Sequence, residues 1–160
     1  VEGEINLGGF SLTMRLDRVD MLNDGRLIII DYKTGKSEVT TTTMRGERPD
    51  EPQLPLYLLA SQSDAASAVV FAQVKMGEMK FKALARDSDL LPSVKADSEW
   101  EQLITSWRTD LTRIAESFSK GDAKVNPKKY PDTCRNCDVQ PFCRIYERIE
   151  GAYAEPEDGA

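Results

Sequence analysis

The 160-residue sequence contains no histidine, only three cysteines and no excess of positive charge. Without histidine, the chain cannot supply an imidazole as a general base, as the partner of a nucleophile or as a metal ligand. Its net charge of −6 argues against a general polyanion-binding surface, although it does not exclude a local basic groove. The chemistry of this chain must therefore come from its acids, lysines and cysteines.

The sequence also lacks long hydrophobic runs. No apolar stretch reaches the roughly 18 to 20 residues needed to cross a bilayer, and no signal-peptide pattern opens the chain. We therefore expect a cytoplasmic protein that does not bind membranes. The opening "VEGEINLGGF" has no initiator Met and resembles the inside of a strand, so we expect a fragment of a longer protein. Its length and its 40% hydrophobic content fit one globular core.

Hydrophobic periodicity predicts a mixture of strands and helices. Strands are expected over residues 2–7, 10–20, 26–33, 67–74 and 78–85, a long loop over 34–48, and helices over 49–63 and 100–118. The strand over 26–33 is nearly all aliphatic, which indicates a central strand that is covered on both faces. We divide the chain into a core (1–86), a connector and a helix that packs on the core (87–123), a cysteine segment (124–150) and a flexible tail (151–160).

The stretch "LIIIDYKTGK" ends this central strand with an acid and a lysine. Because side chains alternate along a strand, Asp31 and Lys33 lie on one face and Tyr32 on the other. Asp17, near the end of the preceding predicted strand, can lie beside them. Two such carboxylates suit Mg²⁺ or Mn²⁺, and Lys33 can orient a water or stabilise developing negative charge. An ordinary ion pair between Asp31 and Lys33 explains the spacing equally well.

The helix over 49–63 carries Gln53 and Tyr57 on one face, since they are four residues apart. If this helix packs beside the central strand, both side chains can reach the same pocket and hydrogen-bond a phosphate or a base. The alternative is a helix edge with a buried tyrosine. Arg18 and Lys36 are candidate contacts to DNA phosphates, and for both the alternative is a surface or structural ion pair.

The segment "LDRVDMLNDGRLIIIDYKTGK", followed along the chain by "QLPLY", resembles the RecB-type nucleases of the PD-(D/E)xK superfamily. The resemblance spans residues 2–75. It implies an α/β, restriction-endonuclease-like fold with a mixed β-sheet core flanked by helices, and an N-terminal core helix that is missing from this fragment. It also implies metal ligation by Asp17, Asp31 and the backbone carbonyl of Tyr32, and catalytic roles for Asp17, Asp31, Lys33, Gln53 and Tyr57.

The three cysteines, Cys134, Cys137 and Cys143, lie close together near the end of the chain. An odd number in an intracellular chain argues against disulfides, whereas zinc or an iron–sulfur cluster would normally need four ligands. The spacing resembles the iron–sulfur nuclease domains of the AddB type and of CRISPR-associated RecB-like nucleases, in which a fourth cysteine lies far upstream. This resemblance implies a [4Fe–4S] cluster in the full-length protein. The alternative is that the cysteines pack or stay free.

Together these features predict a Mg²⁺- or Mn²⁺-dependent DNA nuclease domain, and more specifically an exonuclease of a helicase–nuclease protein that acts in recombination and repair. Its partners would be DNA and a helicase domain or subunit. Two other hypotheses stay open. One is a catalytically silent module that binds DNA ends or a partner protein. The other is a structural domain that depends on its cluster and whose nuclease-like site is incidental.

Overall fold

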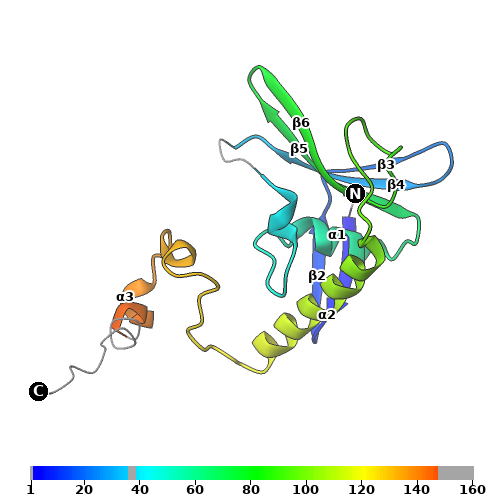
Figure 1. Ribbon diagram of the computed structural model, residues 1–160. Helices are drawn as coiled ribbons and strands as arrows, with labels where there is room; N and C mark the ends of the chain where they lie inside the picture. Colours follow the sequence, from blue (N-terminus) through cyan, green and yellow to red (C-terminus); the bar gives the residue numbers. More distant parts are fainter. Residues whose placement is uncertain (1, 36–38, 148–160) are drawn as a thin grey trace, which may run out of the picture. The chain divides into compact units, whose positions relative to one another are not determined.

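The computed structural model describes residues 2–35 and 39–147 (Figure 1). Contacts between residues divide the chain into two units, Val1–Gly121 and Asp122–Ala160. The first unit contains two β-sheets and the helices that pack on them, and the second contains the cysteines. Within the described residues, none of the helices combines the length and the apolar composition needed to cross a membrane.

A four-stranded mixed sheet forms the centre of the first unit, in the order β3-β4-β5-β6 (Figure 1). The strands are β3 (Arg18–Met21), β4 (Leu27–Lys33), β5 (Ala66–Lys75) and β6 (Glu78–Ala85). β4 and β5 are parallel, whereas β3 and β6 pair antiparallel with their neighbours. The α/β class, the mixed sheet flanked by helices and the central position of β4 are confirmed.

A separate two-stranded sheet consists of β1 (Glu2–Leu7) and β2 (Phe10–Arg15). The predicted continuous strand over 10–20 is therefore wrong, because the chain leaves one sheet after Arg15 and enters the other at Arg18. Between them, Leu16 is buried in the core. The side chain of Asp17 accepts a hydrogen bond from the Tyr32 backbone amide at 3.0 Å, so it takes the place of a strand partner for β4.

The turn between β1 and β2 requires glycine at Gly8. Its φ is +53°, and a Cβ built there would lie 2.4 Å from the backbone nitrogen of Glu116. Such a separation is a steric clash with backbone atoms that cannot move independently. Gly8 therefore allows the turn to lie directly against the long helix that contains Glu116.

Three helical segments pack in this unit: η1 (Thr41–Met44, a 3₁₀-helix), α1 (Gln53–Ser61) and α2 (Trp100–Ser119). The predicted helix over 49–63 begins later than expected, at Gln53, with Pro52 as its N-cap. The predicted loop over 34–48 includes η1, and α2 agrees with the predicted helix to within a residue. α1 contacts β1, β4, β5 and α2, so it lies at the centre of the packing.

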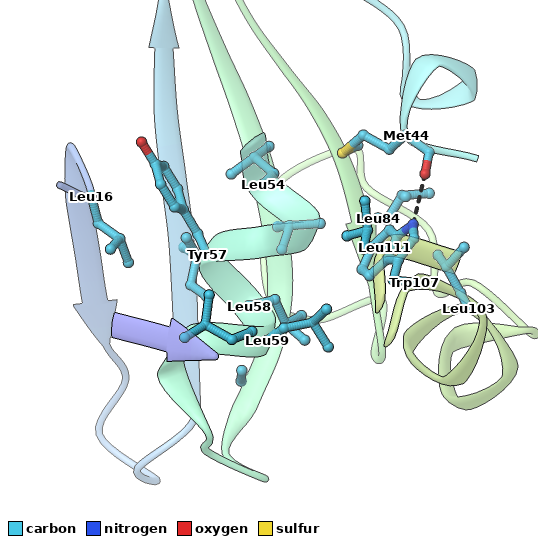
Figure 2. Close-up of a cluster of buried hydrophobic side chains, with 14 of the residues drawn as sticks. Leu16, Met44, Leu54, Tyr57, Leu58, Leu59, Leu84, Leu103, Trp107 and Leu111 are labelled. Carbon is cyan, nitrogen blue, oxygen red and sulfur yellow. Dashed lines mark hydrogen bonds between the residues drawn. The ribbon is translucent and has the colours of Figure 1, made fainter. Parts of the chain in front are cut away.

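The sheet has a hydrophobic cluster on each face. The larger cluster joins one face of β4 and β5 to β1, η1, α1 and α2, and Figure 2 shows the leucines of α1 within it. Trp107 of α2 is 1% exposed and donates its indole N–H to the backbone oxygen of Met44 at 2.6 Å (Figure 2). The smaller cluster covers the opposite face with residues from the segment after β6, including Leu90, Leu91 and Val94.

The second unit contains the short helices η2 (Asp132–Cys134) and α3 (Gln140–Cys143). Most of its described large apolar side chains are exposed, among them Val139 and Phe142, whereas Ile145 is buried. The predicted tail over 151–160 lies outside the described residues.

Candidate active site at the end of β4

Asp31 and Lys33 lie at the C-terminal end of β4, on the face that carries Ile29 and the larger cluster. The Lys33 Nζ is 3.0 Å from the Asp31 Oδ2. Oδ2 thus makes an ion pair with this ammonium, but it has no hydrogen-bond partner of good geometry among the described residues. Since Asp31 is only 2% exposed, its carboxylate is buried with an oxygen that is not fully satisfied.

Asp17 reaches the same strand end from the link between β2 and β3. Its Oδ2 accepts the Tyr32 amide at 3.0 Å, so the peptide that joins Asp31 to Tyr32 lies between the two carboxylates. Asp17 is exposed, whereas Asp31 is buried. The passage from one sheet to the other after Arg15 thus brings an exposed and a buried acid to one end of β4.

α1 contributes Gln53 and Tyr57, which continue a line of hydrogen bonds from Lys33. The Lys33 Nζ donates to the Gln53 Oε1 at 3.2 Å, and the Gln53 Nε2 donates to the Tyr57 hydroxyl at 2.7 Å. The Tyr57 hydroxyl donates to the backbone oxygen of Arg15 at 2.8 Å. α1 therefore packs beside the central strand, which is the condition under which Gln53 and Tyr57 can reach the end of β4. In this structure Gln53 and Tyr57 use these hydrogen bonds to hold Lys33.

Glu51 is a further acid at this site that sequence analysis missed. Its Oε2 lies 3.8 Å from the Lys33 Nζ. Glu51 stands two residues before Gln53 in "DEPQ", and this closeness to a candidate site residue is the signal in the sequence that points to it. The ring of Phe71, on β5, lies under Lys33 with 5.3 Å between Nζ and the ring centroid. Nothing in the sequence around Phe71 indicates this contact.

The charges of these groups shift the pKa values of Asp31 and Lys33. Burial raises the pKa of Asp31, Lys33 opposes this, and the negative charges of Asp17 and Glu51 add to the increase. Burial alone would lower the pKa of Lys33, but Asp31 and then Glu51 and Asp17 outweigh it, so the pKa of Lys33 is raised. Three carboxylates thus influence one ammonium group, which leaves an excess of negative charge at the strand end.

These residues fit a hard divalent cation. A buried carboxylate oxygen without a hydrogen-bond partner among the described residues, a second carboxylate near it and an excess of negative charge are the features that Mg²⁺ or Mn²⁺ would compensate. Among the residues that the structure describes, no three acidic, cysteine or histidine side chains approach closely enough to form a metal site by themselves. The fit therefore rests on two carboxylates and a main-chain oxygen, and ligation by the Tyr32 carbonyl stays a prediction.

Arg18 lies on the opposite face of the sheet. It pairs with Ile30 across β3 and β4, and its guanidinium binds the Asp20 carboxylate at 2.6 Å and the Tyr32 hydroxyl at 3.2 Å. The structure therefore does not bring Arg18 next to Lys33, and a contact between Arg18 and DNA phosphate stays a prediction. Lys36, the other predicted DNA contact, lies outside the described residues.

The three cysteines are free and partly exposed. The Cys143 thiol donates to the Gln140 backbone oxygen at 3.4 Å. Across residues 2–35 and 39–147 there is no group of three metal-ligating side chains, so this arrangement gives the predicted iron–sulfur site no support.

Comparison with known proteins identifies a family for this chain. The family model described as "PD-(D/E)XK nuclease superfamily" matches residues 1–144. A search of curated proteins found no match. A solved structure described as "Crystal structure of SSO0001" matches with 17% identity and a TM-score of 0.47, over 89% of this chain and 56% of that one. The chain thus spans just over half the length of that protein.

Proposed function

Because the chain belongs to the PD-(D/E)XK nuclease superfamily, we propose that it hydrolyses phosphodiester bonds of DNA with Mg²⁺ or Mn²⁺. The observation that carries this proposal is the buried, incompletely satisfied carboxylate of Asp31 between Lys33 and the Tyr32 peptide bound by Asp17. A buried carboxylate without full hydrogen bonding is costly for a purely structural protein. A divalent cation would compensate this carboxylate together with the Lys33 ammonium.

Each side chain at the strand end has a proposed role. Asp17, Asp31 and the Tyr32 carbonyl would hold the metal, which when bound supplies Lewis acidity and an acidified water. Lys33 stabilises negative charge on the phosphate and orients the attacking water. Gln53 and Tyr57 keep the Lys33 ammonium in place, because their hydrogen bonds end at a backbone oxygen that the fold holds still. Such fixed geometry is what a catalytic group needs.

The finer assignment also belongs to this proposal. The order of Asp17, Asp31, Lys33, Gln53 and Tyr57 supports a RecB-type exonuclease, which would work with a helicase domain or subunit in recombination and repair. The spacing of Cys134, Cys137 and Cys143 supports a [4Fe–4S] cluster with a fourth ligand from outside this chain. Reconstitution of an extended protein with iron and sulfide, followed by its absorption spectrum, tests the cluster independently of cleavage.

The nuclease proposal is tested by the degradation of linear single- and double-stranded DNA in Mg²⁺ or Mn²⁺. We expect cleavage by the native chain and none by Asp31→Ala. Asp64→Ala, which removes an exposed acid from the loop between α1 and β5, is the matched control and should cleave normally. Circular dichroism shows whether each variant is folded.

Two outcomes would contradict the proposal. Cleavage by Asp31→Ala at the native rate would exclude Asp31 from the site. Absence of cleavage by the folded native chain, with DNA still bound, would favour the alternative of a catalytically silent module that binds DNA ends.

A further inference from the structure

The face of the sheet opposite the candidate site carries an exposed groove of about 450 Å³. Its lining includes Arg18, Asp20, Tyr32, Ala72, Met79 and Phe81. Tyr32 is 43% exposed, Phe81 49% and Met79 81%, so three large apolar side chains face solvent together. Isolated exposed apolar side chains are ordinary on protein surfaces, but a group that lines one groove indicates a binding surface.

The register of the strands explains the shape of this groove. Tyr32 of β4 pairs with Ala72 of β5, and Ala72 pairs with Phe81 of β6, so the three side chains form one row across the sheet. Because neighbouring strands lie about 4.8 Å apart, the Cα atoms of Tyr32 and Phe81 are about 10 Å apart. The side chain between them is only the methyl group of Ala72. Ala72 itself is only 4% exposed, so a flat ring would lie against the exposed faces of Tyr32 and Phe81 and not directly on Ala72.

The next row of paired residues lies on the other face of the sheet and differs in its burial. On the other face, Asp31 pairs with Phe71, and the ring of Phe71 is fully buried in the larger cluster. Tyr32 and Phe81 are instead 43% and 49% exposed, so these two rings do not serve only to fill the core.

Arg18 fixes one wall of the groove before any ligand is present. It donates to the Tyr32 hydroxyl at 3.2 Å, and Asp20 holds Arg18 through an ion pair of 2.6 Å. A side chain that is already ordered loses less conformational entropy when a ligand binds. The ion pair also disfavours an apolar protein segment as the occupant, because such a segment would have to bury both charges.

We propose that this groove binds an unstacked base of single-stranded DNA, next to the phosphate that is held at Asp31 and Lys33. The proposal rests on the proposed nuclease function and adds a preference for single strands. Tyr32 follows Asp31 directly in β4, and their side chains lie on opposite faces of the sheet. A single DNA strand that passes around this end of the sheet can therefore place a phosphate on one face and a base on the other. Duplex DNA keeps its bases stacked, whereas an unpaired base can stack on aromatic side chains.

Binding of a short oligothymidylate to the full chain in EDTA tests this proposal without cleavage. Because a base would lose a stacking partner in either variant, Tyr32→Ala and Phe81→Ala should each raise the Kd about tenfold. Tyr32→Phe keeps the ring and should bind nearly as the native chain does. Phe118→Ala removes an aromatic side chain that is 73% exposed on α2, and it should leave the Kd unchanged.

A second substrate sharpens the test. Binding of blunt duplex DNA should change less than twofold in all these variants. Thermal melting identifies any variant that fails to fold, and its result is then replaced by that of Tyr32→Leu or Phe81→Leu.

Two results would overturn the proposal. One is an oligothymidylate Kd that does not respond to Tyr32→Ala and Phe81→Ala. The other is self-association of the native chain in sedimentation that Phe81→Ala abolishes, since the groove would then be an interface between copies. Neither result affects the cleavage test with Asp31→Ala, so failure of this proposal and failure of the nuclease assignment are distinguishable.

Discussion

The two faces of β4 are built from alternate residues of one seven-residue strand, yet they differ in almost every physical respect. On one face, Ile29 joins the larger cluster and is followed by the hydrogen-bonded and ion-paired groups of Asp31 and Lys33. On the other, Ile30 joins the smaller cluster and is followed by the half-exposed ring of Tyr32. A single strand can thus hold reactive groups rigidly and still offer a surface to a ligand.

The largest expected effect is on the polar face. Lys33→Ala should lower the cleavage rate about a hundred- to a thousandfold, because it removes a charge that stabilises the transition state. Its melting temperature should also fall, because Asp31 then stays buried without its cationic partner, so the rate is measured at a temperature at which circular dichroism shows the variant to be folded. Lys120→Ala, at the exposed lysine that directly follows α2, is the control and should cleave normally. Single-turnover cleavage measures the rate, and a loss below threefold would mean that Lys33 is structural.

The two clusters should differ in stability. Leu54 is fully buried in the larger cluster, so Leu54→Ala should lower the free energy of unfolding by about 3 kcal/mol or more. Leu90 lies in the smaller cluster, where a loop forms one wall and can collapse onto the space, so Leu90→Ala should cost about 2 kcal/mol. Urea denaturation measures both. A larger loss of unfolding free energy for Leu90→Ala than for Leu54→Ala would contradict this prediction.

A smaller effect on stability is expected when the hydroxyl group of either of two tyrosines is removed, and the loss should differ between them. Tyr57→Phe removes the group that connects Gln53 to the Arg15 backbone oxygen, so it should cost about 1 to 2 kcal/mol of stability. Tyr32→Phe removes one exposed hydrogen bond with Arg18 and should cost less than about 0.5 kcal/mol. The comparison uses the same substitution on both faces, and equal losses would contradict it.

The smallest effect is a pH-dependent gain. Burial raises the pKa of Asp31, so ionisation of its carboxyl costs more in the folded chain than in the unfolded one. This cost is absent below the unfolded pKa of about 3.9 and grows as the pH rises through the folded pKa. In EDTA, Asp31→Asn should therefore raise the melting temperature at pH 7, less so near pH 4. A gain that does not vary with pH would exclude this cause.

Periodicity was sufficient to predict most of the fold. The aliphatic run of β4, the paired strands β5 and β6, and the apolar spacing of α2 each produced the predicted element. The break at Asp17 was not predictable in this way, because the alternation of Leu12, Met14 and Leu16 continues through it. The separation into two sheets depends on the burial of Leu16 and on the hydrogen bond that the Tyr32 amide donates to the Asp17 carboxylate.

The candidate site was predictable to a similar extent. The spacing of Asp31 and Lys33 placed them on one face, and the spacing of Gln53 and Tyr57 placed them together on α1. Glu51 and the Arg15 backbone oxygen were missed. They come from segments without a regular pattern, and their contacts depend on how α1 packs against the sheets. The groove of Tyr32 and Phe81 depends on the register between three strands, which alternation within one strand does not give.

The bond from the Tyr32 amide to Asp17 has a practical consequence for the design of inactive forms. Because the same carboxylate is a proposed metal ligand and an acceptor that keeps β4 attached to its neighbour, Asp17→Ala would remove both functions at once. Asp17→Asn retains an oxygen that can accept the amide while it removes the negative charge. For trapping a nucleic acid on an intact but inactive protein, the asparagine form is therefore the better choice.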